Sequence, residues 1–162
     1  MDSLLISLIS ACTALVASIV APFVTLSVAR RQFNATVLSA NRQKWIESLR
    51  DLLAELISLF VAALVVKSKW KDTWNKGLGA LDAEPALIAK LERIVLVQWK
   101  IRLLINPAEP DHQQLYRAID VAFKRLQAED MNESDTEADL EMITDLAQKI
   151  LKREWQRVKQ GV

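Results

Sequence analysis

The chain has 162 residues, of which 51% are hydrophobic and only three are glycine, a composition that favours helix and fits one domain plus a membrane segment. Its net charge of +1 indicates neither a nucleic acid nor an acidic substrate as a partner. With one cysteine and one histidine, a single chain forms neither a disulfide nor a Cys/His zinc cluster. We therefore expect an all-α protein that is not an enzyme and holds no cofactor or metal.

The first segment is apolar enough to be a membrane anchor. Ser3–Ala29 is a run of 27 residues without a charge. As a helix it is about 40 Å long, more than the roughly 30 Å of a hydrocarbon core. The alternative is a cleaved signal, and Ile9–Cys12 resembles a lipoprotein cleavage box. No basic residue precedes that box and the uncharged run continues beyond it, which favours a retained transmembrane helix.

The charges that flank this run predict its orientation. Arg30 and Arg31 follow it, whereas Asp2 stands alone before it. The positive-inside rule then places the N-terminus outside and the C-terminal part in the cytosol, with Arg30 and Arg31 in contact with lipid. The sequence therefore predicts a single-pass protein of the inner (cytoplasmic) membrane.

Small residues recur along one face of the predicted transmembrane helix. They have heptad spacing, and their positions are Ser7, Ala11, Ala14, Ser18 and Ala21. Such a seam lets two transmembrane backbones approach closely, although serine and alanine are also simply common in these helices. The unbroken register favours self-association. If the assembly forms a wide ring, the serine and threonine hydroxyls of this segment would line a pore.

A second long helix is predicted from Asn34 to Lys76, which contain neither proline nor glycine. One apolar stripe follows it: Leu38, Trp45, Leu49, Leu52, Leu56, Phe60, Ala63 and Val66. Leu56–Val66 is uncharged and apolar all round, so it should be buried on every side. A lone hairpin would cover about half of it. We therefore expect a homo-oligomer whose contacts include Leu56, Leu59, Phe60 and Ala63.

The remaining chain predicts three further helical segments. Gly77 resembles a helix C-cap, Pro85 begins a helix, and the Asn106–Pro110 turn separates it from another that ends near residue 128. Packing these two collinearly against the long helix gives a hairpin. Residues 129–141 hold seven acids, and Ser134 with Glu137 resembles a capping box. In this topology the acidic segment lies near the membrane, where anionic lipids repel it.

The expected organisation is therefore a transmembrane anchor in residues 1–31, a cytosolic helical hairpin in 32–128, an acidic linker in 129–134 and a C-terminal helix in 135–162. The fold class is all-α, an N-terminal transmembrane helix followed by a cytosolic helical hairpin or bundle, and the protein is expected to be oligomeric.

His112 and the segment 67–76 are the two candidate functional features of the helical part. Some helical nucleases use an arginine and a histidine four to six residues apart on one helix, but no arginine lies four to six residues before His112. A catalytic role is therefore not predicted for His112, and a helix cap or a surface position is favoured. The segment 67–76 alternates lysines with tryptophans and carries the candidate partner contacts Lys67, Trp70, Lys71 and Trp74. Interfacial anchoring and stacking on single-stranded nucleic acid are the alternatives. A bare helix end lacks a nucleic-acid groove, so nucleic acid is not expected.

Two motifs resemble a group of small bacterial single-span proteins of unassigned function. They are Asn41–Ile46 with Leu49-Arg50, and Leu103–Glu109 with His112. More loosely, the plan of anchor and self-associating helical domain resembles membrane effectors of antiviral defence, including a CRISPR-associated protein that forms oligomeric pores. The Arg-His pairing of those proteins is not matched here.

Two functions are therefore expected. The first is a membrane-anchored protein that self-assembles into a homo-oligomer, as a pore or defence effector. The alternative is a membrane tether whose cytosolic helical domain docks a soluble protein.

Overall fold

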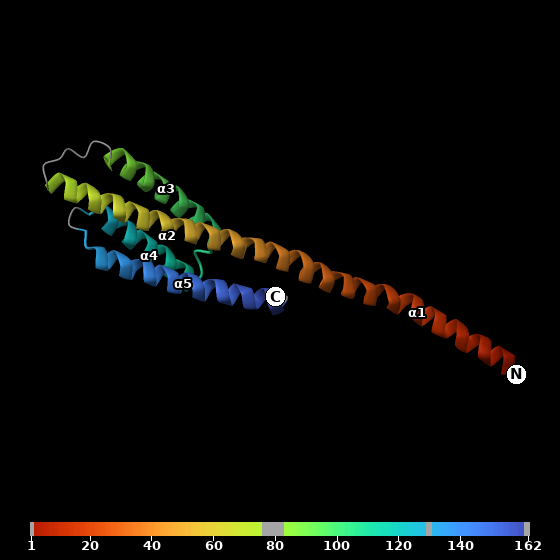
Figure 1. Cartoon of the computed structure of the whole chain (residues 1–162). Helices are drawn as coiled ribbons and strands as arrows, with labels where there is room; N and C mark the ends of the chain where they lie inside the picture. Colours follow the sequence, from red (N-terminus) through yellow and green to blue (C-terminus); the bar gives the residue numbers. More distant parts are fainter. Residues whose placement is uncertain (1, 76–82, 129–130, 161–162) are drawn as a thin grey trace. The chain divides into compact units, whose positions relative to one another are not determined.

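The computed structural model describes residues 2–75, 83–128 and 131–160, and within these ranges it contains helices and no strand. The elements are α1 (Asp2–Phe33), the π-helical η1 (Asn34–Leu38), α2 (Ser39–Asn75), α3 (Ala83–Leu104), α4 (Pro110–Gln127) and α5 (Glu133–Gln160) (Figure 1). The all-α prediction is confirmed. Gly77, the predicted C-cap, lies outside the described residues.

The chain divides into two compact units. One consists of residues 1–42 and 157–162, and the other of residues 43–156. The first contains α1, whose described side chains from Leu8 to Arg30 are all exposed. The second, which we call the four-helix unit, contains parts or all of α2, α3, α4 and α5.

Within the four-helix unit, consecutive helices alternate in direction (Figure 1). Arg93 of α3 forms an ion pair with Glu55 of α2, and Trp45 Nε1, near the start of α2, donates to the Leu104 carbonyl, 2.8 Å away, at the end of α3. These contacts make α2 and α3 antiparallel.

The same reasoning gives the directions of α4 and α5. Arg102 near the end of α3 donates to the hydroxyl of Tyr116 in the first half of α4, so α4 folds back along α3. The predicted collinear arrangement of these two helices is therefore wrong. Arg125 near the end of α4 lies 3.0 Å from Asp139 near the start of α5, which reverses direction again.

The core of the four-helix unit consists of aliphatic side chains from all four helices. It includes Leu49, Leu56, Phe60, Ile94, Ile101, Leu115, Ile119, Ile143 and Ile150. The buried stripe on α2 differs slightly from the predicted one, because Ile46, Leu53 and Lys67 are buried. Trp45, Leu52 and Val66 are only half-buried, and Leu38, at the end of η1, is exposed. A straight helix of 3.6 residues per turn shifts a stripe in this way.

The uncharged run Leu56–Val66 is covered largely by the chain's own helices. Leu56, Phe60 and Ala63 are fully buried, and Leu59 packs against the core. Only Val61 and Val65 remain prominent at the surface, 49% and 48% exposed. The prediction that this run needs neighbouring copies omitted α5, which packs along α2 and supplies the missing cover.

Capping residues determine where α4 and α5 begin. Pro110 lies in the first turn of α4, where the absence of its N–H costs nothing. Asn132 caps α5: its Oδ1 accepts from the Ser134 N–H at 3.2 Å, and its carbonyl accepts from Thr136. The predicted capping box of Ser134 and Glu137 therefore lies inside the helix rather than at its start.

Lys67 has an internal role that its sequence context did not indicate. Its side chain is buried, and its Nζ donates to the Leu126 carbonyl at 2.7 Å and to the Ala128 carbonyl. Carbonyls at a helix C-terminus have no partner within the helix and carry the negative end of the helix dipole. The Lys67 ammonium therefore ties α2 to the end of α4.

We expect Lys67→Met to lower the free energy of unfolding by about 1–3 kcal/mol, because the buried carbonyls of Leu126 and Ala128 lose a charged donor. The matched control is Lys71→Met, since Lys71 is exposed and its loss should change stability by less than about 0.5 kcal/mol. Urea unfolding of both variants in nonionic detergent, followed by circular dichroism, measures the difference. Equal unfolding midpoints would contradict the capping role of Lys67.

Candidate functional site

The densest polar cluster lies where α4 begins and α5 approaches its end. The Arg153 guanidinium of α5 pairs with Glu109 and Asp111, which flank Pro110 at the start of α4, and with its neighbour Glu154 at 3.2 Å. Asp111 and Glu154 are buried. The bidentate geometry of arginine lets one side chain hold the N-terminal turn of α4 against α5.

His112 completes this cluster and is almost fully buried. Its Nδ1 accepts from the Asn106 backbone N–H at 3.0 Å, and its ring lies 6.0 Å from the Trp45 ring. Its Nε2 lies 3.5 Å from Arg153 Nη2 and 3.9 Å from Glu109 Oε2. The expectation of a cap or surface residue is thus corrected: His112 is buried and ties down the α3–α4 turn through the Asn106 amide.

The structure brings an arginine to His112 that sequence spacing did not reveal, because Arg153 lies 41 residues further along the chain. A signal was present nonetheless. The buried face of α5 repeats through Ile143, Ala147 and Ile150, and the next position, 154, is a glutamate. A charged residue on an apolar face usually has a partner opposite it, since burying an unpaired charge is costly.

Glu109, Asp111 and His112 place three ligand atoms within 4.8 Å of one another, close enough for a metal ion. Two features make them a poor fit. Arg153 pairs with both carboxylates, so a cation would have to displace its guanidinium. The His112 Nδ1 accepts a hydrogen bond, so the neutral ring carries its proton on Nε2 and has no lone pair there for a metal.

The electrostatics of Arg153 agree with a structural role. Burial alone would lower the pKa of its guanidinium, but the hydrogen bond to Glu154 and the charges of Asp111 and Glu109 raise it overall. A raised pKa keeps the group charged, and its stabilisation is lost only when the pH rises past an already strongly alkaline value. Arg153 is therefore suited to permanent ion pairing and not to proton transfer.

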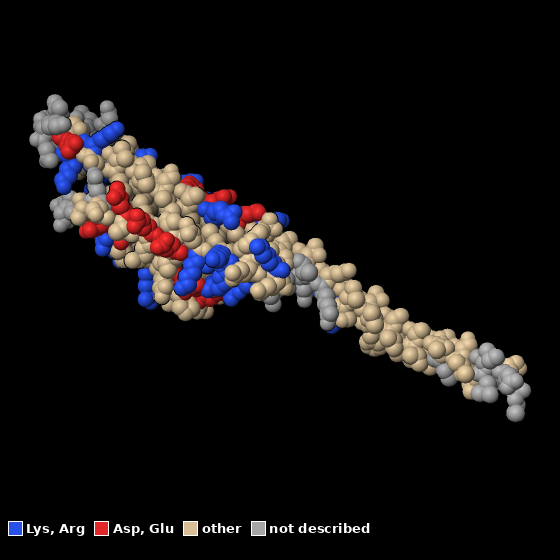
Figure 2. Space-filling view, turned by 60° about the horizontal axis from the view of Figure 1, so that its bottom comes forward, with Lys and Arg blue, Asp and Glu red and all other residues tan. Residues whose placement is uncertain are grey.

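The two halves of α5 differ in charge. Gln43 lies at the end where α3 finishes and α4 starts, as the Trp45–Leu104 hydrogen bond shows. On α5, the first half carries Asp135, Glu137, Asp139 and Glu141, whereas the second half carries Lys149, Lys152 and Arg153. Figure 2 shows a row of acidic side chains followed along the same face by a group of basic ones, with further basic side chains at the end beyond the acidic row.

This polarity removes the conflict in the predicted topology. Lys67, which meets Leu126 and Ala128, lies 22 residues beyond Trp45 on α2, a distance of about 33 Å along a helix. Because α4 runs back along α3, the acidic start of α5 lies at the end of the unit away from Gln43. The basic second half of α5 lies at the end that contains Gln43, because Arg153 pairs with Glu109 and Asp111 at the start of α4.

The predicted seam residues belong to α1 and to α2. In α1, Ala11, Ala14, Ser18, Ala21 and Arg30 are exposed, whereas the side chains of Ser7 and Arg31 lie outside the described ones. In α2, Leu56, Phe60 and Ala63 are core residues and Leu59 is half-buried. The second group thus stabilises the four-helix unit itself.

The four predicted partner contacts likewise divide into buried and exposed residues. Lys67 is buried and Trp70 is half-buried, whereas Lys71 and Trp74 are exposed. The rings of Trp70 and Trp74 lie 5.9 Å apart, centroid to centroid. A surface contact at this end of α2 is therefore left with Trp74 and Lys71 as its accessible groups.

An apolar surface on α3 was missed. Ile88, Val95, Leu96, Trp99 and Leu103 are exposed, and Leu103 is 84% exposed. Ile94, Val97 and Ile101 of the same helix occupy the core. α3 is apolar on several sides, so hydrophobic periodicity alone does not identify its buried face.

Comparison with known proteins adds no relative. The chain matches no protein-family model, no curated protein and no solved structure.

We expect Arg153→Met to lower the free energy of unfolding by about 2–3 kcal/mol, because Glu109, Asp111 and Glu154 lose a shared counter-charge in a partly buried site. The neighbouring Lys152→Met, which removes an exposed charge, is the control. Thermal unfolding of the full chain in detergent should separate the two by roughly 5–10 °C. If Arg153→Met and Lys152→Met unfold at the same temperature, the cluster does not hold α5 to the α3–α4 turn.

Proposed function

We propose that this protein is a single-span membrane protein that displays the four-helix unit at the cytosolic face and self-associates in the bilayer through α1. The observation that carries the proposal is the contrast between the two units. The described side chains of α1 from Leu8 to Ala29 are uncharged and exposed, and the span Leu8–Arg30 has a mean hydropathy of 2.1 with no buried part, while the other helices bury an ordinary core. A surface of that extent is unfavourable in water and favourable in a bilayer.

The hydroxyl groups of α1 support a lipid environment. Thr13 donates to the Ile9 carbonyl at 2.6 Å, Ser18 to that of Leu15 at 2.8 Å, and Thr25 to that of Ala21 at 2.8 Å. In hydrocarbon, where water is absent, polar groups need such partners within the protein. These hydroxyls are therefore satisfied without a second helix or a water-filled pore.

The charge polarity of the four-helix unit supports the cytosolic placement. The basic half of α5 lies at the end where the chain arrives from Arg30, and the acidic half lies at the other end. Anionic lipids of the cytosolic leaflet attract the first and repel the second, at about 1 kcal/mol for each charge near the surface. Both the flanking arginine and this polarity favour the same orientation.

A second candidate function is that of a tether for a soluble protein. It rests on Trp74, which is 66% exposed beside the exposed Lys71 at the end of α2 away from Gln43. An exposed tryptophan with an adjacent cation is typical of contact residues in protein interfaces.

Site-specific labelling tests the orientation. In a Cys12→Ser background, we expect Lys149→Cys to react with a membrane-impermeant maleimide only after the cells are permeabilised. The comparison is Asp2→Cys, at the other end of the apolar run, which should react in intact cells. Labelling of Lys149→Cys in intact cells would refute a cytosolic four-helix unit.

Larger side chains in the small-residue seam of α1 test the proposed self-association. Replacing Ala14 and Ser18 with leucine should keep the helix apolar but prevent close approach of two copies, so the mass in detergent should fall toward that of one chain. The paired control changes Val16 and Val20 to leucine, because at 100° per residue they lie on the other side of α1. Light scattering after size-exclusion chromatography measures both. A parent protein that is already monomeric would leave the tether as the better proposal.

A further inference from the structure

A small cavity of about 170 Å³ lies beside the α3–α4 turn. Its walls come from the end of α3 and the first turns of α4: Arg102, Ile105, Pro107, His112, Gln113, Tyr116 and Arg117. Two arginine side chains therefore border one cavity. Within residues 2–75, 83–128 and 131–160, neither Arg102 nor Arg117 has a carboxylate at ion-pair distance.

Arg102 is held in place without an acidic partner. Its guanidinium carbon lies 5.0 Å from the centre of the Trp99 ring and 4.9 Å from that of Tyr116, and its Nη1 donates to the Tyr116 hydroxyl at 3.2 Å. These aromatic contacts orient the planar group and leave most of its five donors for a ligand. A guanidinium prepared in this way favours a phosphate, which accepts two parallel hydrogen bonds.

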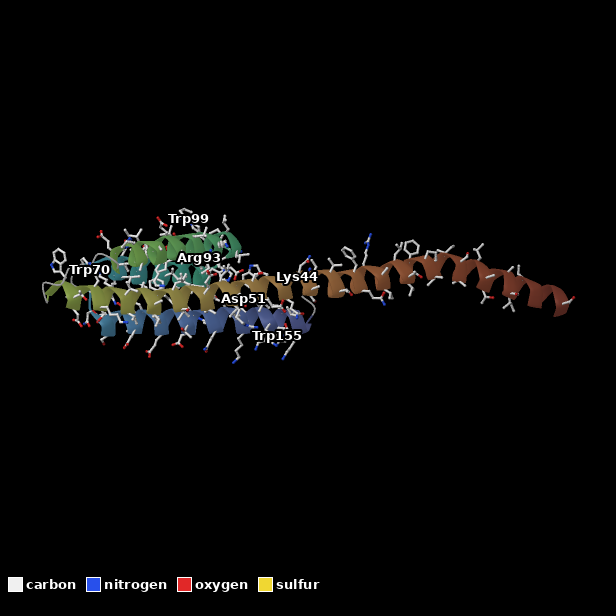
Figure 3. All side chains as sticks on the ribbon, turned by 45° about the horizontal axis from the view of Figure 1, so that its top comes forward. Lys44, Asp51, Trp70, Arg93, Trp99 and Trp155 are labelled. Carbon is white, nitrogen blue, oxygen red and sulfur yellow. The ribbon has the colours of Figure 1, made fainter. Side chains whose placement is uncertain are left out.

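The surroundings of the cavity indicate where that phosphate comes from. Trp99 projects from α3 away from the bundle and is 55% exposed (Figure 3), and Leu103, four residues on, is exposed further still. Aliphatic and tryptophan side chains beside cations are typical of the membrane interface, where the rings lie at the level of the headgroups.

The bilayer is also within reach of this cavity. The hydrogen bond from Trp45 to Leu104 places the end of α3 beside the start of α2, so the cavity lies at the end of the four-helix unit that holds Gln43. Twelve residues separate Gln43 from Arg30, and even fully extended they span at most about 45 Å. The cavity is therefore tethered to the helix that is proposed to cross the bilayer, which raises the effective concentration of lipid headgroups available to it.

We propose that Arg102 and Arg117 bind the phosphate group of an anionic phospholipid, with Trp99 and Leu103 inserted beside its acyl chains. The phosphate takes the cavity, and the four-helix unit is thereby held against the membrane. The lipid as source of the phosphate rests on the proposed membrane crossing of α1; the binding chemistry of the cavity does not.

The test is a calorimetric titration of the full chain in nonionic detergent with dihexanoyl phosphatidylglycerol below its own micelle concentration. We expect saturable binding that Arg102→Gln combined with Arg117→Gln weakens at least tenfold. The matched control, Lys69→Gln with Lys71→Gln, removes the same charge from exposed positions at the other end of the unit and should bind within twofold of the parent. Circular dichroism checks that each variant remains helical.

Two further arms decide the source of the phosphate. Inorganic phosphate should bind at least tenfold more weakly than the lipid, because it lacks the chains that contact Trp99 and Leu103. The variant Leu103→Ala, which leaves the contacts of Arg102 with Trp99 and Tyr116 in place, should weaken the lipid and leave inorganic phosphate within twofold. The proposal fails if the arginine variant binds the lipid like the parent, or if inorganic phosphate binds as tightly as the lipid. The titration in detergent does not depend on where α1 lies. A negative titration would therefore refute the phosphate site alone, and a negative cysteine-labelling result would refute the proposed membrane orientation alone.

Discussion

Arg153 contacts two residues that flank a proline, and much of the four-helix unit depends on this contact. Glu109 and Asp111 lie on either side of Pro110, where α3 has ended and α4 begins. His112 holds the same turn, because its Nδ1 accepts a hydrogen bond from the Asn106 backbone N–H. Because the turn is held from α5 and from within, α4 is directed back along α3 and cannot continue its line. A four-helix unit results, in which every helix contributes buried side chains to one core.

The reversal at this turn also distributes charge. With α4 folded back, α5 starts at the end of the unit marked by Lys67 and Ala128 and finishes at the end marked by Trp45 and Leu104. Its acidic first half and basic second half are thereby separated along the unit. Such a dipolar arrangement costs little in water but matters at an anionic surface, where one end is attracted and the other repelled. The polarity is thus a property of topology as much as of composition.

The same arrangement changes which surfaces are available to partners. The apolar run on α2 is mostly internal, so its leucines stabilise the unit and are not free to join copies. The exposed apolar groups lie instead on α1 and on the outward face of α3. Both surfaces suit a bilayer, one across its core and the other at its interface. If α1 crosses the membrane as proposed, assembly is expected to involve α1 first, with lipid contacts made by α3.

The sequence by itself determined the helical class, the apolar N-terminal helix and the helix boundaries near Pro85 and Pro110. These follow from local chemistry: charge-free length, proline geometry and 3.6-residue periodicity. Only the tertiary structure decided the direction of α4, the burial of Lys67 and the pairing of Arg153 with residues more than 40 positions away. Periodicity shows that a helix has an apolar face but does not name the helix that covers it. In α3, where several faces are apolar, it does not even select the face.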